Sequence, residues 1–133
     1  MLSAAPAGWM ETLGARIAEA EPGRVVLELE AGPQHRHGGG VVQGGVITQI
    51  ADAAMGIAYA CTLEEGESFT TIEMKINFLK PVWNARLKAI GRVAKKGRTV
   101  GLVECDVTDE KKHLVARASS TCLTLRDKQA HGR

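Results

Sequence analysis

The sequence is poor in aromatic residues and in cysteine, and it has no long apolar run. Phe, Tyr and Trp make up 4% of the 133 residues, and the three cysteines lie far apart at positions 61, 105 and 122. With no Cys-X-X-Cys pair, they indicate neither a disulfide framework nor a zinc site, and they suit a reducing compartment. No segment approaches the roughly 18 apolar residues of a membrane span. We therefore expect a cytoplasmic protein without a membrane partner.

Excess charge of one sign is also absent. The formal net charge is +2, which argues against a nucleic-acid partner. The N-terminal residues lack a basic region followed by an apolar stretch, so we expect no signal peptide. An apolar content of 44% in 133 residues fits one domain with one core. We treat residues 1–133 as a single domain with a polar tail at 126–133.

The most informative stretch is 43–63. Its apolar residues recur every three or four positions and predict one face of an α-helix: Val46, Ile47, Ile50, Ala51, Ala54, Ile57, Ala58 and Cys61. A second stripe is small or polar: Gly45, Thr48, Gln49, Asp52, Gly56 and Tyr59. Asp52 is the only residue of the stretch that is ionised by default. A largely buried helix with one carboxylate at mid-length indicates a functional site.

The remaining patterns predict strands. A short helix at 6–13 is followed by strands at 15–20 and 24–31, and four strands follow the long helix, at 69–79, 85–94, 99–108 and 114–125. We expect the long helix to end near Glu64. In the first strand after it, alternation places Ile72, Met74, Ile76 and Phe78 on one side and Thr71, Glu73, Lys75 and Asn77 on the other. Without βαβ alternation, an α+β domain with one antiparallel sheet around the helix is favoured.

Gln43-Gly44-Gly45 followed by Asp52 resembles the signature of the hotdog-fold acyl-CoA thioesterases. The likeness is to the PaaI-type branch, which is related to the 4-hydroxybenzoyl-CoA thioesterases. That family carries His-Gly-Gly at the start of its central helix and an acidic residue nine positions after the His. Residues 70–82 and 96–100 resemble the following strand and turn. The resemblance implies a hotdog fold, in which an antiparallel sheet of five or six strands wraps around one long helix.

The resemblance also implies roles for individual residues. Asp52 matches the catalytic carboxylate, which acts as nucleophile on the thioester carbon or as general base for water. Gly44 matches the residue whose N–H polarises the thioester carbonyl. Thr71 matches a hydroxyl that holds the attacking water. Gly45 and His37 are assigned to substrate binding, and His37 occupies a place where relatives carry Asn or Gln.

Gln43 departs from the family pattern, because it stands where the family has His. A glutamine still offers N–H donors, but it cannot titrate, so proton transfer at this position is excluded. A catalytic role in positioning the substrate or binding its carbonyl remains. The substitution also leaves open a protein that binds acyl-CoA without hydrolysing it.

The resemblance further implies a homodimer, in many relatives paired into a tetramer. Gln43 and Gly44 of one subunit would face Asp52 and Thr71 of the other. The substrate would be an aryl- or medium-chain acyl-CoA, with coenzyme A as part of the substrate and no separate cofactor. Residues 80–103 contain a run of basic residues that would attract the phosphates of coenzyme A. Three of them are assigned to phosphate binding: Lys95, Lys96 and Arg98.

Other interpretations stay open. A hotdog hydratase or dehydratase pairs a titratable His with an acid, which position 43 lacks, so His37 would have to replace it. A purely structural dimerisation domain leaves the carboxylate of Asp52 unexplained. His35 and His37 are two residues apart but have no third ligand nearby, so we assign no metal.

Overall fold

The computed structural model describes residues 8–126. Its elements are α1 (Gly8–Leu13), β1 (Ala15–Glu21), β2 (Arg24–Ala31), the 3-10 turn η1 (Pro33–His35), α2 (Gly44–Ala60), β3 (Ser68–Phe78), β4 (Ala85–Lys96), β5 (Val100–Thr108) and β6 (Leu114–Leu125). The expected helix start at Pro6 and the polar tail beyond Arg126 lie outside the described residues. Within residues 8–126, neither helix has the length and apolar content to cross a bilayer.

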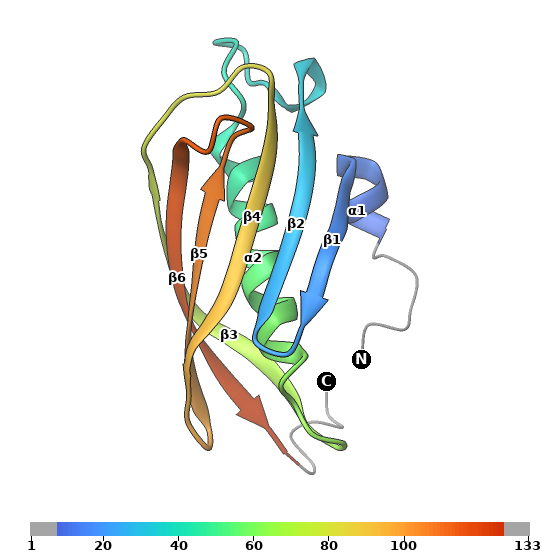
Figure 1. Cartoon of the computed structure of the whole chain (residues 1–133), viewed down its shortest axis with the longest axis vertical. Coiled ribbons are helices and arrows are strands. Elements are labelled where there is room, and N and C mark those ends of the chain that lie inside the picture. Colours follow the sequence, from blue (N-terminus) through green and yellow to red (C-terminus); the bar gives the residue numbers. More distant parts are fainter. Residues whose placement is uncertain (1–7, 127–133) are drawn as a thin grey trace.

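The six strands form one sheet in the order β1-β2-β4-β5-β6-β3, and every neighbouring pair is antiparallel. The sheet curls around α2, which lies along its concave face (Figure 1). This arrangement confirms the expected α+β hotdog fold, with six strands.

Helix α2 ends earlier than the sequence predicts, at Ala60 instead of near Glu64. The Tyr59 carbonyl accepts hydrogen bonds from both the N–H and the hydroxyl of Thr62, at 2.9 and 2.6 Å. These two bonds satisfy an end carbonyl of the helix and close a turn in place of another helical turn. Of the residues predicted to form the apolar face, only Cys61 therefore lies beyond the end of the helix.

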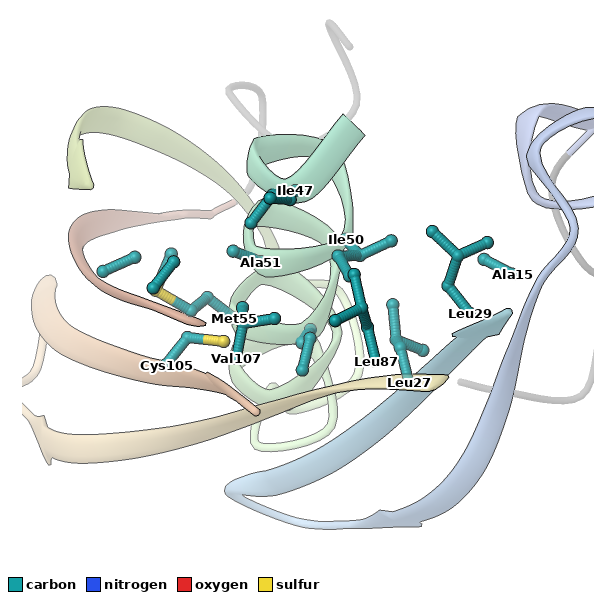
Figure 2. Packing of buried hydrophobic residues seen from close by; sticks show 14 of the residues in the cluster. Ala15, Leu27, Leu29, Ile47, Ile50, Ala51, Met55, Leu87, Cys105 and Val107 are labelled. Atoms are coloured by element: carbon teal, nitrogen blue, oxygen red, sulfur yellow. The ribbon is translucent and has the colours of Figure 1, made fainter. Parts of the chain in front are cut away.

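One face of α2 forms the centre of the core. Ile47, Ile50, Ala51 and Met55 are at most 4% exposed, and they point from the helix towards the sheet (Figure 2). Figure 2 shows side chains from β2, β4 and β5 meeting them. Burying the Ile and Met side chains contributes about 1.5–3 kcal/mol each, and the smaller Ala51 contributes less, so this contact stabilises the fold substantially.

Two glycines allow α2 to lie very close to the sheet. A Cβ atom on Gly91 of β4 would lie 2.5 Å from the backbone C and O of Ala54. A Cβ on Gly101 of β5 would lie 2.5 Å from the Tyr59 ring. Both distances are shorter than van der Waals contact, so a side chain at Gly91 would push against the helix backbone, and one at Gly101 would displace the Tyr59 ring.

Tyr59 is a core residue, as residues at its spacing usually are, although it lies on the small, polar stripe of the helix. It is fully buried. Its ring packs against Phe69 at a centroid distance of 5.6 Å, and its hydroxyl is 2.5 Å from Oγ1 of Thr124. The space left by Gly101 and the hydroxyl partner on β6 together make the core position possible.

The strict alternation predicted along β3 is wrong at one place. Thr71 pairs with Cys122 and Glu73 with Thr121, so the register shifts and Ile72 is an extra residue in a β-bulge. As a result Thr71 contacts the core residue Cys122, whereas Glu73 accepts a hydrogen bond from Thr121 on the outer face. The bulge turns Thr71 towards α2.

The close approach of α2 to β4 can be tested by Gly91→Ala. The added methyl would meet backbone atoms that cannot rotate away, and we expect a loss of about 1–3 kcal/mol in the free energy of unfolding. Gly38→Ala is the matched control, because a Cβ there meets nothing within 4 Å. Urea unfolding curves measure both variants. Equal midpoints for Gly91→Ala and Gly38→Ala would contradict the tight packing.

Candidate active site

One row of α2 runs beside the edge strand β3. At its start, an ideal Cβ on Gly44 would lie 3.1 Å from Cζ of Phe78, and near its end a Cβ on Gly56 would lie 3.4 Å from Cζ of Phe69. The strand therefore runs antiparallel to the helix, with its middle residues opposite the helix's middle residues. Asp52 lies two helical turns after Gly44, in the central part of this row.

Asp52 and Thr71 are brought to the same region. Partial burial raises the pKa of the Asp52 carboxyl above its ordinary value, although the side chain keeps contact with water on the surface of the single chain. Burial also raises the pKa of the Cys122 thiol, and the negative charge of Asp52 adds to this effect. The same thiol lies 3.9 Å from Oγ1 of Thr71. The Cys122 thiol thus lies within contact of the Thr71 hydroxyl and within electrostatic reach of the Asp52 carboxylate.

The N-terminus of α2 offers backbone donors. Val46 and Ile47 donate their N–H groups to the carbonyl of Gln43, at 3.0 and 3.5 Å. Within residues 8–126, no acceptor forms a hydrogen bond with the N–H of Gly44 or Gly45. The Gln43 side chain is exposed and does not cap the helix. Free N–H groups at the positive end of a helix can stabilise an oxyanion.

The single chain does not bring these donors to its own carboxylate. Eight residues separate Gly44 from Asp52, which corresponds to about 12 Å along an α-helix. One thioester carbonyl cannot contact both groups at that distance. The free donors and the carboxylate therefore lie in two separate places on the helix, the donors at the start of α2 and the carboxylate at its middle.

The two loop histidines differ in their surroundings. His37 is exposed, and its Nδ1 accepts a hydrogen bond of 2.7 Å from the N–H of Gly39. His35 is buried, with Nδ1 accepting from Gly32 N–H at 3.1 Å and Nε2 lying 2.7 Å from the Leu13 carbonyl. Both ring nitrogens of His35 are thus occupied. The described part of the chain holds no cluster of three or more His, Cys, Asp or Glu side chains that could bind a metal.

The basic residues assigned to phosphate binding lie at the β4–β5 turn. Lys96 donates to the Thr62 carbonyl at 2.8 Å and stands 5.7 Å from the centre of the Tyr59 ring, so it stabilises the end of α2. Lys95 and Arg98 are exposed. Other cations of the run pair with carboxylates: Lys80 with Asp109, Arg86 with Glu30, Lys88 with Glu28 and Arg92 with Glu104. Among residues 8–126, Lys95, Lys96 and Arg98 form no ion pair with a carboxylate, so positive charge remains at this turn in the described part of the chain.

The structure adds features that the sequence patterns do not identify as functional. An apolar groove of about 380 Å³ adjoins Gly44, and Phe78 forms part of it. Cys122 lies under Thr71. The apolar alternation of β3 marks Phe78 as a core candidate, but no local pattern indicates that its ring contacts Gly44. That contact depends on how β3 runs along α2.

Known proteins share both the sequence and the fold. Residues 39–116 match the thioesterase superfamily. The chain belongs to this superfamily. It is 34% identical over 116 residues to a Saccharolobus solfataricus protein provisionally named an esterase, covering 87% of this chain and 82% of that protein. Thioester hydrolysis is therefore its general activity, as the resemblance of the Gly-Gly and Asp52 pattern implies.

Two further similarities extend this result. The 1,4-dihydroxy-2-naphthoyl-CoA hydrolase of Listeria monocytogenes is 27% identical over 114 residues, covering 86% of this chain and 93% of that enzyme. The structure of the E. coli PaaI protein from the phenylacetic acid degradation operon superposes with a TM-score of 0.83 at 21% identity, covering 90% of this thioesterase and 85% of PaaI. The PaaI similarity confirms the hotdog fold.

The partial burial of Asp52 predicts that its charge destabilises the folded chain. A pKa raised above 3.8 means that folding disfavours the ionised carboxylate. The resulting loss of stability is complete at pH values above the raised pKa. It disappears below pH 3.8, where the group is protonated in both the folded and the unfolded chain. We expect Asp52→Asn to be more stable than wild type at pH 7. The difference should shrink as the pH falls through the raised pKa. Thermal unfolding at several pH values measures it.

The control for this experiment is Glu65→Gln, which neutralises an exposed carboxylate in the loop after α2. We expect it to change stability by no more than about 0.5 kcal/mol. If Asp52→Asn were no more stable than wild type at pH 7, the conclusion that partial burial of the Asp52 carboxylate destabilises the fold would be contradicted.

Proposed function

We propose that this thioesterase hydrolyses an aryl- or medium-chain acyl-CoA to the free acid and coenzyme A. The observation that carries the proposal is the pair of free N–H groups at Gly44 and Gly45 on the same helix as the carboxylate of Asp52. A helix N-terminus stabilises developing negative charge, and a carboxylate supplies the nucleophile or the base. Hydrolysis of a thioester needs both functions.

The proposed reaction balances with water as the only co-reactant. The N–H of Gly44 donates to the thioester oxygen, which takes up negative charge when the carbonyl carbon is attacked. Either Asp52 attacks directly and water later cleaves the anhydride, or Asp52 removes a proton from water held by Thr71. The C–S bond breaks, and coenzyme A leaves as the thiolate and takes up a proton. Gln43 and His37 orient the substrate, and neither a metal nor an organic cofactor takes part.

A second copy of the chain would complete this site. Edge strand β3 has no partner on its outer side within residues 8–126, and Ile72, Phe78 and Leu79 near it are 55%, 52% and 56% exposed. A long apolar edge strand favours pairing with another chain. Pairing two β3 strands antiparallel would set the two α2 helices side by side in opposite directions. Gly44 of one subunit would then approach Asp52 of the other.

The substrate class rests on the surroundings of Gly44 and on relatives. The adjoining groove is apolar, and the Listeria relative is named for hydrolysing an aromatic acyl-CoA. Lys95, Lys96 and Arg98 would attract the coenzyme A phosphates, which the pantetheine arm separates from the thioester. We propose a cytoplasmic location for the reaction and a dimer, or a dimer of dimers, as the active form.

Asp52→Ala tests the catalytic assignment. Removing the nucleophile or general base should lower kcat/KM by on the order of 10²-fold or more. Release of free thiol from a panel of aryl- and straight-chain acyl-CoAs measures it, with Glu65→Gln as the control variant. Equal rates for Asp52→Ala and wild type would refute the role of Asp52. Tight acyl-CoA binding by calorimetry without turnover by wild type would indicate a binding protein.

Mixed dimers test the shared site. Gly44→Pro removes the N–H in question, and the backbone of the extended Gln43, with φ and ψ of −66° and 137°, is compatible with Pro at the first helical position. The added Cβ would require the Phe78 ring, 3.1 Å away, to shift slightly. Gly44→Pro and Asp52→Ala should each be inactive alone. Co-expressed in equal amounts, they should recover about a quarter of wild-type activity, because a quarter of the sites combine two intact halves. No recovery in confirmed mixed oligomers would place both groups in one subunit.

A further inference from the structure

We infer that Phe78 determines the size of the acyl group that this thioesterase accepts. The inference rests on the proposed function and assigns the groove beside Gly44 to the acyl group. The groove has a volume of about 380 Å³, and aliphatic and aromatic side chains dominate its lining: Val41, Val42, Ile47, Phe78, Leu79, Pro81 and Val82. Gly44 and Lys80 complete it.

Phe78 stands where the acyl group would enter. Its Cζ lies 3.1 Å from an ideal Cβ on Gly44, so the ring packs against the backbone beside the free N–H. In the single chain the other side of the ring is exposed, since the side chain is 52% exposed, and it lies at the edge proposed above to pair with a second subunit. A thioester oxygen bound by the Gly44 N–H would place the first carbons of its acyl group beside this ring.

The rest of the groove is held by hydrogen bonds. The N–H groups of Leu79 and Lys80 both donate to the Val115 carbonyl, at 2.8 and 3.2 Å, and Val42 N–H donates to the Val82 carbonyl at 2.8 Å. These bonds fix the backbone on two sides of the groove. The Phe78 ring, by contrast, is a side chain on an exposed edge strand. It is the largest side chain of the lining and lies against Gly44, so a change in its size alters the groove next to the Gly44 N–H.

The charge of the groove restricts the substrate class. Among the described residues that line the groove, Lys80 is the only charged one, and its ammonium lies 2.5 Å from Oδ2 of Asp109. This contact holds the pKa of the Asp109 carboxyl well below its usual range, so that carboxylate stays ionised beside the ammonium. Residues 8–126 therefore leave the groove no unpaired cation for a second carboxylate. The groove therefore fits an uncharged apolar acyl group and disfavours a dicarboxylic one.

Two substitutions that change the size of the side chain in opposite directions test the inference. Phe78→Ala enlarges the groove and Phe78→Trp narrows it, so the preferred acyl group should become longer in the first variant and shorter in the second. Each additional methylene that enters the groove should raise kcat/KM by about fourfold. The assay measures kcat/KM for a straight-chain acyl-CoA series, benzoyl-CoA and succinyl-CoA. Trp83→Ala is the matched control, because Trp83 is also 52% exposed and lies outside the groove.

The outcomes are distinct. Opposite shifts in the two Phe78 variants, with an unshifted profile in Trp83→Ala, support the inference. Profiles that stay parallel to wild type overturn it while leaving the proposed function intact, and so does efficient hydrolysis of succinyl-CoA. If wild type hydrolyses no acyl-CoA, the proposed function fails first. Light scattering measures the mass of each variant, and loss of the oligomer without any profile shift in Phe78→Trp would make Phe78 an interface residue instead.

Discussion

The closeness of α2 to the sheet is the constraint on which the other features depend. Gly91 lets the backbone of α2 lie directly against β4, and Gly101 leaves room for the Tyr59 ring against β5, so the helix is held with its apolar face towards the sheet. The direction in which the opposite face of the helix points is therefore fixed as well. It presents glycine at its start and Asp52 at its middle, beside an edge strand that has a free side. The packing of the core thus decides where the chemistry can be.

Helix geometry then divides the site. An α-helix rises about 1.5 Å per residue, so the backbone positions of Gly44 and Asp52 lie about 12 Å apart along the axis, farther than one thioester carbonyl can span. Only a second helix in the opposite orientation could bring such groups together. Activity and assembly would then be one property, since the exposed edge that favours pairing lies beside the groups that need it.

Periodicity in the sequence was sufficient to predict the helix, the strands and the antiparallel class, because each depends on local repeats of polar and apolar residues. The spacing of Gly44 and Asp52 was sufficient to suggest the candidate site through its resemblance to a family. Features that depend on pairing register were not predictable. The bulge at Ile72, which turns Thr71 towards α2, and the burial of Tyr59 beneath Gly101 both involve residues distant in the sequence. So does the contact between Phe78 and Gly44.

Gln43 places an unusual demand on the proposed site. Since glutamine cannot titrate and Nδ1 of His37 is engaged by its own loop, Asp52 is the one acid–base group among the residues assigned to the chemical step. Its pKa must then satisfy two requirements. Burial has to raise the pKa enough to make the carboxylate reactive, yet leave it ionised near neutral pH. The partial exposure of Asp52 on the single chain leaves room for a second subunit to increase that burial, so assembly itself would tune the catalytic group.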